Sequence, residues 1–483
     1  MTQSGAAKAG LYTLTGTAVH MLVQIAGLVI LARVLQPEEF GVYAVAMTVI
    51  GITTLFQDLG LSTAAVQAKE LPTQVRTNLW WINASVGGGL ALLTVALAPL
   101  AAWFYREPAV HTVLYVMAPT LLLAGFAAQY RASLMRSMRY GILAIIDTTA
   151  AVVGMTLSLL LAFSGGGVLA LTVPQVVTGV GTLVAVVWAA KWFPGRARRG
   201  FGTRKLLRFG VAYFLNGLLT YAHRNLDVVL LGRLHGKAVV GEFNRASQIT
   251  RAPLSMLSNP FARVALSTMA PVQDDNKALA SLARKGQIML NVPILFVAGG
   301  LIAAAGPLVE LALGNDWGAS VPFVRLIAAS EVFALMGSVA GWILTSCGRG
   351  GTLMLLSVTS LITKAFSVGI GTLWGAYGIV AGVAISHAIL WPFSLYWAGR
   401  VTGVRTKELL TSSSMHVAVG GLSALGAWGV SSMFVGSLPA LAQLVVIGVL
   451  LLCFHGAAMW LCSGYRSDVR FAVNGVRSAL KRS

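Results

Sequence analysis

The sequence predicts an all-α, polytopic membrane protein with about fourteen transmembrane helices. Of its 483 residues, 57% are hydrophobic and only 10% are charged, whereas soluble domains carry about 25% charged residues. Apolar stretches of about 20 residues, the length that crosses a hydrocarbon core of about 30 Å, recur along the whole chain. Lys and Arg outnumber Asp and Glu by 35 to 15 and gather in alternate connections between these stretches.

The candidate spans follow one another with short connections. Each span has roughly 34 residues of chain available, so no soluble catalytic domain fits between them. The fourteen spans are expected at residues 11–33, 41–63, 79–104, 110–132, 142–164, 167–190, 209–232, 239–266, 286–313, 322–346, 352–373, 375–398, 411–435 and 438–462.

The positive charges indicate membrane orientation rather than nucleic-acid binding. With the N-terminus in the cytoplasm, 25 Lys and Arg residues fall in cytoplasmic connections, four in outer connections and six within spans. This bias is the positive-inside pattern of membrane proteins. We therefore expect both termini in the cytoplasm and no nucleic-acid partner. The three cysteines lie in or beside spans and give no disulfide framework.

An internal repeat divides the chain into two halves. The run LARVLQPEEFGVYAVA at 31–46 aligns without gaps with LGRLHGKAVVGEFNRA at 231–246. Six spans per repeat give both halves the same orientation, with a binding site at their interface. The predicted organisation is an N-terminal six-helix bundle (1–190), a basic cytoplasmic linker (191–208), a C-terminal six-helix bundle (209–400), two further helices (401–462) and a basic cytoplasmic tail (463–483).

The span at 239–266 gives the strongest indication of a binding site. At about 100° per residue, seven polar side chains share an arc of about 120°. A charge at the bilayer centre costs at least about 2.5–3.5 kcal/mol, so such residues normally face a protein interior or a watery cavity. Guanidinium groups bind phosphate bidentately, which predicts a cavity for an anionic headgroup. The seven residues are Asn244, Arg245, Gln248, Arg251, Ser255, Asn259 and Arg263.

Other polar residues within spans allow two interpretations. In the span at 209–232, Arg224 is a candidate for substrate binding, while Asp227 forms either an ion-coupling site or a structural pair with Arg224 or Arg245. The same two interpretations hold for Asp58, Asp147, Glu331 and Lys364, with Arg263 or Arg76 as the partner expected for Asp58.

The acidic pair Glu38–Glu39 is the candidate for catalysis in the first outer connection. Pro37 suits a first helical position, so both carboxylates are expected in the first turn of a helix, where the helix dipole favours them. Nucleotide-binding, hydrolase and metal-ligand motifs do not occur in the sequence. We therefore expect no catalysis and no cofactor. The driving force should then come from an ion gradient, the membrane potential or consumption of the product.

The run LARVLQPEEFGVYAVAMTVIGITTLFQDLGLS at 31–62 resembles the start of polysaccharide flippases, the Wzx and WzxC-like group of the multidrug/oligosaccharidyl-lipid/polysaccharide exporter superfamily. Residues 231–264 and 311–328 are similar to the second half of the same family. The resemblance implies two six-helix bundles around a central cavity plus two extra helices. It also implies a flippase that moves an undecaprenyl-diphosphate-linked oligosaccharide from the inner to the outer leaflet for exopolysaccharide or lipopolysaccharide assembly. Its setting would be the bacterial cell membrane, with membrane lipid and other polysaccharide assembly proteins as partners.

Two alternative functions remain open. A drug or cation exporter of the same superfamily would need an acidic or aromatic cavity, which the intramembrane arginines disfavour. A membrane polysaccharide polymerase or glycosyltransferase would need a sizeable outer loop. The longest outer connection expected here, near 313–321, has only about ten residues.

Overall fold

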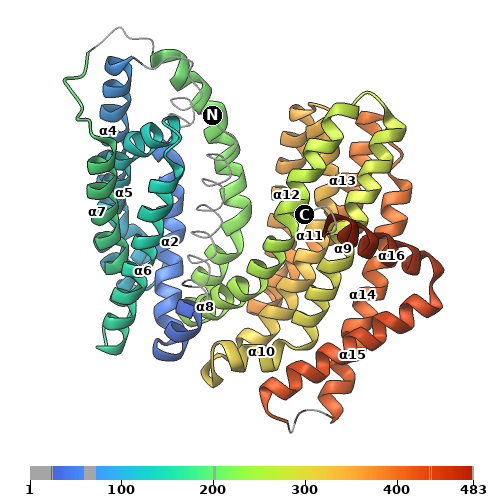
Figure 1. Ribbon diagram of the computed structural model, residues 1–483. Coiled ribbons are helices and arrows are strands. Elements are labelled where there is room, and N and C mark those ends of the chain that lie inside the picture. Colours follow the sequence, from blue (N-terminus) through green and yellow to red (C-terminus); the bar gives the residue numbers. More distant parts are fainter. Residues whose placement is uncertain are drawn as a thin grey trace. The chain divides into compact units, whose positions relative to one another are not determined.

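The computed structural model describes residue 23 and residues 26–58, 72–198, 203–434, 436 and 438–480. Every regular element in these ranges is a helix, which confirms the predicted fold class (Figure 1). The helices are α2 (Pro37–Asp58), α4 (Thr73–Tyr105), α5 (Pro108–Arg136), α6 (Tyr140–Phe163), α7 (Leu169–Ala190), α8 (Thr203–Met269), α9 (Asn276–Ala303), α10 (Ala305–Ala312), α11 (Ser320–Ser346), α12 (Gly350–Gly371), α13 (Gly375–Thr402), α14 (Lys407–Phe434), α15 (Ala440–Leu461) and α16 (Ser463–Leu480).

The helices match the predicted spans closely. Nine helical segments of the described chain are long and apolar enough to cross a membrane: α4 to α7, α9, α11, the continuous stretch of α12 and α13, α14 and α15. The predicted spans at 41–63, 209–232 and 239–266 correspond to α2 and the two parts of α8. Most of the predicted span at 11–33 lies outside the described residues.

The chain forms two compact units, Met1–Gly241 and Glu242–Ser483. The boundary falls within α8, which is not one continuous helix. At Gly236 the backbone has φ 83°, a conformation that favours glycine, and this break separates the two spans predicted from the sequence. The division predicted from the repeat places residues 209–241 in the second bundle and remains a prediction.

Helix breaks occupy equivalent positions in the two copies of the repeat. Gln36 interrupts the first copy just before α2 begins, and Gly236, its partner in the alignment, interrupts the second. Pro37 is the first residue of α2, and the Glu39 Oε2 atom accepts a hydrogen bond of 2.8 Å from the Gln36 N–H. The first-turn position predicted for Glu38 and Glu39 is therefore confirmed.

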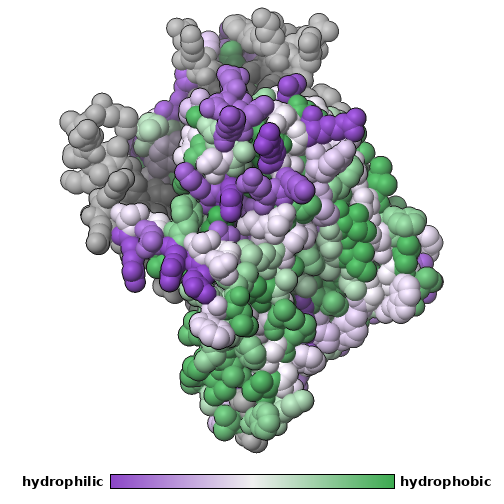
Figure 2. All heavy atoms as spheres, turned by 90° about the vertical axis from the view of Figure 1, so that its right-hand side faces the viewer, coloured by the Kyte–Doolittle hydropathy of each residue, from purple (hydrophilic) through white to green (hydrophobic). Residues whose placement is uncertain are grey.

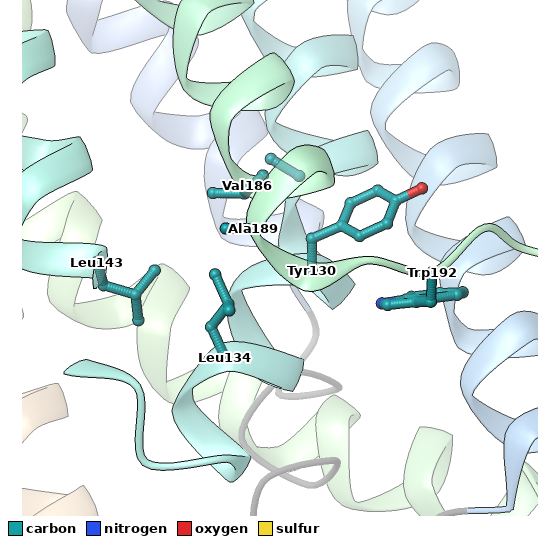
Figure 3. Packing of buried hydrophobic residues seen from close by; sticks show 7 residues of the cluster. Tyr130, Leu134, Leu143, Val186, Ala189 and Trp192 are labelled. Atoms are coloured by element: carbon teal, nitrogen blue, oxygen red, sulfur yellow. The ribbon is translucent and has the colours of Figure 1, made fainter. Parts of the chain in front are cut away.

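The first unit is held together at one end by a cluster of buried apolar side chains (Figure 3). It joins α5, α6 and α7 to Trp192, which directly follows α7. The Arg76 guanidinium from α4 lies 4.1 Å from the centre of the Trp192 ring. This cation–π contact keeps Arg76 against the protein. The cluster consists of Ala127, Tyr130, Leu134, Leu143, Val186, Ala189 and Trp192.

Large apolar side chains cover much of the outer surface of the second unit. On α15, Leu441, Val445 and Leu452 are more than 60% exposed. Figure 2 shows hydrophobic residues over much of this face, with hydrophilic residues gathered toward its upper end. Such a surface is stable in contact with lipid tails, as expected for a chain that spans a membrane.

Candidate functional site

The second part of α8 presents its polar side chains on one face, as predicted. Gln248, Asn259 and Arg263 are exposed along this face, and Asn244 is half-buried. Ser255, also exposed, lies between them. The accessible polar face therefore extends over more than four helical turns, within a segment whose other face packs against the unit.

Arg245 lies at one end of this face and is only 8% exposed. Its Nη1 atom donates a hydrogen bond of 2.6 Å to Oε1 of Gln248, one turn further along α8. The pairing holds the guanidinium group in a fixed position beside the exposed amide of Gln248. A guanidinium held in this way is suited to a planar anion such as a phosphate group.

Arg251 forms an ion pair with Glu331 of α11. The Arg251 Nε atom lies 2.8 Å from Oε1 of Glu331, and the two side chains are 42% and 21% exposed. A carboxylate from a second helix therefore fixes Arg251, while most of the guanidinium's five N–H donors remain for other acceptors. The ion pair joins two residues that the sequence analysis selected separately.

Two further ionisable residues lie close to this ion pair. His387 of α13 contacts the neighbouring Ser330, with its Nδ1 atom 2.9 Å from the Ser330 hydroxyl. The charges of Glu331, Lys364 and Arg251 all act on the His387 ring. Lys364 of α12 is only 3% exposed. Four helices, α8, α11, α12 and α13, thus each contribute one ionisable side chain, and the cluster of Arg251, Glu331, Lys364 and His387 has an excess of positive charge.

The acidic residues predicted in the first unit have different surroundings. Asp147 of α6 forms a bidentate pair with Arg131 of α5, with two N–O distances of 2.8 Å. Asp227 is 1% exposed and accepts a hydrogen bond of 3.1 Å from the Val228 N–H. Arg224 is exposed. The side chain of Asp58 lies outside the described residues, so its predicted pairing with Arg263 or Arg76 stays a prediction.

Sequence reasoning identified these charges but not their partners. Arg251 and Glu331 are 80 positions apart, and Arg131 and Asp147 are 16 positions apart. Helical periodicity relates residues on one helix, whereas these pairs depend on which helices pack together. Among the residues that the structure describes, no three His, Cys, Asp or Glu side chains come together where they could hold a metal ion.

These features define a class of protein: an α-helical, multi-pass membrane protein with a cluster of charged side chains among its helices. Residues 30–322 match the family described as polysaccharide biosynthesis protein. The match spans more than half of the chain, which therefore belongs to this family and confirms the resemblance seen in the sequence.

Sequence similarity to individual proteins covers more of the chain than residues 30–322. The chain is 24% identical to the lipopolysaccharide biosynthesis protein WzxC of Escherichia coli (strain K12) over 369 residues, which is 74% of each chain. It is also 24% identical to the succinoglycan biosynthesis transport protein ExoT of Rhizobium meliloti (strain 1021) over 369 residues, 75% of this chain and 72% of that protein.

Solved structures share the fold. The lipid II flippase MurJ in an inward closed conformation superposes with a TM-score of 0.71 at 13% identity, covering 95% of this chain and 100% of MurJ. An inward-facing multidrug resistance transporter of the MATE family superposes with a TM-score of 0.60 at 16% identity, covering 81% of this chain and 98% of that one. The fold is thus that of the MurJ and MATE transporters.

Proposed function

We propose that this protein is a flippase that moves an undecaprenyl-diphosphate-linked oligosaccharide from the inner to the outer leaflet of the bacterial cell membrane. Relatives named for lipopolysaccharide biosynthesis and succinoglycan transport support the substrate class. The fold shared with a lipid II flippase supports the type of movement. The family and the fold give no support to a polymerase or glycosyltransferase.

The observation that carries the proposal is the ion pair between Arg251 and Glu331 beside Lys364. Arg251 and Lys364 place two cations near the Glu331 carboxylate inside a helical membrane protein, where charges are costly unless they are paired. A diphosphate with about two negative charges complements this excess, because bidentate guanidinium–phosphate contacts are among the strongest charge-assisted hydrogen bonds. These charges support an anion as the ligand of the proposed site.

In the proposed mechanism, Glu331 stays paired with Arg251 until the substrate binds. The diphosphate displaces the Glu331 carboxylate from the guanidinium group, and the same exchange in reverse releases the product. Both states keep Arg251 paired with an anion. Arg245 and Gln248 hold the second phosphate, while Asn244, Asn259 and Arg263 contact the adjoining sugar and phosphate oxygens.

Transport then follows from alternating access. Residues 1–190 and 209–400 form the two bundles of this proposed cycle, with both chain termini in the cytoplasm. An inside-negative membrane potential drives the substrate outward by about 2.3 kcal/mol per charge for each 100 mV. The bidentate contact with Arg131 favours a structural role for Asp147, which leaves Asp58 and Asp227 as candidates for ion coupling or structural pairing.

A drug or cation exporter is the second candidate function, because a MATE multidrug transporter shares the fold. The charge of the site argues against it. Arg251 and Lys364 would repel an organic cation, and Glu331 is already paired with Arg251. A lipid-linked diphosphate is negatively charged, so the same two cations would attract it.

Deletion of the gene tests the proposal in the native cell. We expect an undecaprenyl-diphosphate-linked glycan to accumulate on the cytoplasmic side and surface polysaccharide to disappear. A plasmid copy should restore export, as should a copy with Arg349→Ala, which removes an exposed arginine away from the site. A copy with Arg245→Ala and Arg251→Ala should not restore it at equal membrane abundance. Normal surface polysaccharide in the deletion strain, combined with new drug sensitivity, would contradict the proposal.

A further inference from the structure

The helix α16 follows the last membrane span and is docked against the second unit. The sequence alone identified this segment only as a basic tail. Three of its side chains, Tyr465, Asp468 and Ala472, are less than 10% exposed. Their spacing of three and four residues places them on one face of the helix. α16 therefore has a defined inner face.

Polar contacts fix the rotation of α16 about its own axis. Asp468 Oδ2 lies 3.3 Å from His416 Nε2 and accepts a hydrogen bond of 3.3 Å from the Ser412 hydroxyl. His416 of α14 is fully buried and also contacts Asn291 of α9 at 3.3 Å. Burial raises the pKa of Tyr465 to about 12, so its ring packs beside His416 as a neutral group. The acidic residue of α16 is thus turned inward and paired.

The arginines of α16 lie on the opposite side. At about 100° per residue, Arg466, Arg470 and Arg477 fall within about 40° of one another and far from the buried face. Arg466 is held in place, because it donates hydrogen bonds of 2.7 and 2.8 Å to the carbonyl oxygens of Met459 and Trp460 at the end of α15. Arg470 and Arg477 are exposed.

The start of α16 directly follows a candidate membrane span. Trp460, the penultimate residue of α15, is 79% exposed, and exposed tryptophans at the ends of spans mark the membrane–water interface. Next to the arginines, Phe471 and Val473 expose 39% and 43% of their surface. Exposed cations together with exposed apolar side chains are typical of helices that lie in the plane of the membrane interface.

We propose that α16 is a binding surface for anionic phospholipid, with the headgroup phosphates contacting Arg470 and Arg477. Clusters of Lys and Arg directly after a transmembrane helix attract anionic lipid by about 1 kcal/mol per residue. Five such residues follow α15, including Lys481 and Arg482 near the C-terminus. The carboxylate of Asp468 is on the other side of the helix, against His416. This surface does not depend on the proposed transport function.

Lipid binding to the full-length protein in a nonionic detergent tests this proposal. Phosphatidylglycerol or phosphatidylcholine is titrated, and bound lipids are counted by native mass spectrometry. The wild type should prefer phosphatidylglycerol, and Arg470→Gln/Arg477→Gln should weaken that binding about tenfold to thirtyfold. Salt should weaken it as well.

A matched control removes two exposed arginines elsewhere in the second unit. Arg349→Gln/Arg400→Gln lowers the net charge by the same amount and should leave phosphatidylglycerol binding within twofold of the wild type. Hydrogen exchange along α16 should be equal in both variants, which shows that the helix stays docked. Equal binding of the two lipids by the wild type, equal loss in both variants, or displacement by inorganic phosphate beyond that caused by sodium chloride of the same ionic strength would each overturn the proposal.

Discussion

Gly41 and Gly241 take reciprocal positions in a close backbone crossing. A Cβ atom added at Gly41 would overlap the carbonyl oxygen of Lys237, and one added at Gly241 would overlap the carbonyl oxygen of Pro37. Residues 37 and 237 correspond in the internal repeat, as do residues 41 and 241. The repeat therefore builds a two-fold-like contact in which glycine lets two helical segments approach closely.

Substitution of either glycine should destabilise this crossing. Gly41→Ala and Gly241→Ala each force the backbones apart, and we expect a loss of about 1–3 kcal/mol, typical of overpacking. Gly89→Ala is the control, because Gly89 is exposed on α4 with open space around it. Thermal unfolding in detergent measures the effect, and similar melting of all three variants would show that the crossing tolerates a methyl group.

Removal of the Glu331 carboxylate should strengthen substrate binding. Glu331→Gln keeps the shape of the side chain but no longer competes for Arg251, so the affinity for undecaprenyl diphosphate should rise by about tenfold, as expected for the loss of a nearby like charge. Arg251→Ala should weaken binding by a similar factor. Titration of the detergent-solubilised protein with the lipid measures both.

The control for this prediction is Glu408→Gln. Glu408 pairs with Arg284 at 3.6 Å on an exposed surface, where an ion pair contributes little. Its affinity for the lipid should match that of the wild type. Weaker binding by Glu331→Gln would mean that the carboxylate positions Arg251 for the substrate rather than competing with it.

Exchange of the charges of Arg131 and Asp147 should restore transport that the single variants lose. If Asp147 serves only to pair with Arg131, the double variant Arg131→Asp/Asp147→Arg should regain most of the transport that either single variant loses. Transport of the lipid-linked substrate at matched protein levels gives the comparison. An ion-coupling carboxylate must stay on its own helix, so a double variant as inactive as the single ones would favour coupling.

His416 and Asp468 should prove energetically coupled. His416→Leu leaves the buried Asp468 without its nitrogen partner, and a buried polar group that loses its partner destabilises the fold by about 1–3 kcal/mol. The double variant His416→Leu/Asp468→Asn should recover a large part of this loss. A double-mutant cycle of unfolding free energies measures the coupling, and strictly additive losses would exclude it.

Much of the fold follows from the sequence because membrane spans depend on local properties. Apolar runs locate the helices, and Gly236 marks the turn between two of them. Pro37 and Glu39 define the start of α2. Each of these signals lies within a few residues of its effect, as expected for helix termini.

The details of the site depend on packing between distant segments. The polar face of α8 with Arg251 was visible as a periodic pattern, but its contact with Glu331 arises only when α8 and α11 pack together. The buried position of the Asp468 side chain could not be predicted either, because its partner His416 lies in another span. The amphipathic pattern of α16 itself is present in the sequence and would have identified the helix.

Direct measurement of flipping in proteoliposomes tests the central claim. The purified protein is reconstituted with a fluorescent undecaprenyl-diphosphate-linked oligosaccharide, and a membrane-impermeant glycosidase reports the fraction that reaches the outer leaflet. The wild type should expose the inner-leaflet pool, faster under an inside-negative potential. Arg245→Ala/Arg251→Ala should be slower by at least about 100-fold, because two charge-assisted contacts are lost. A wild-type rate equal to that of protein-free liposomes, or a double variant as fast as the wild type, would contradict the account.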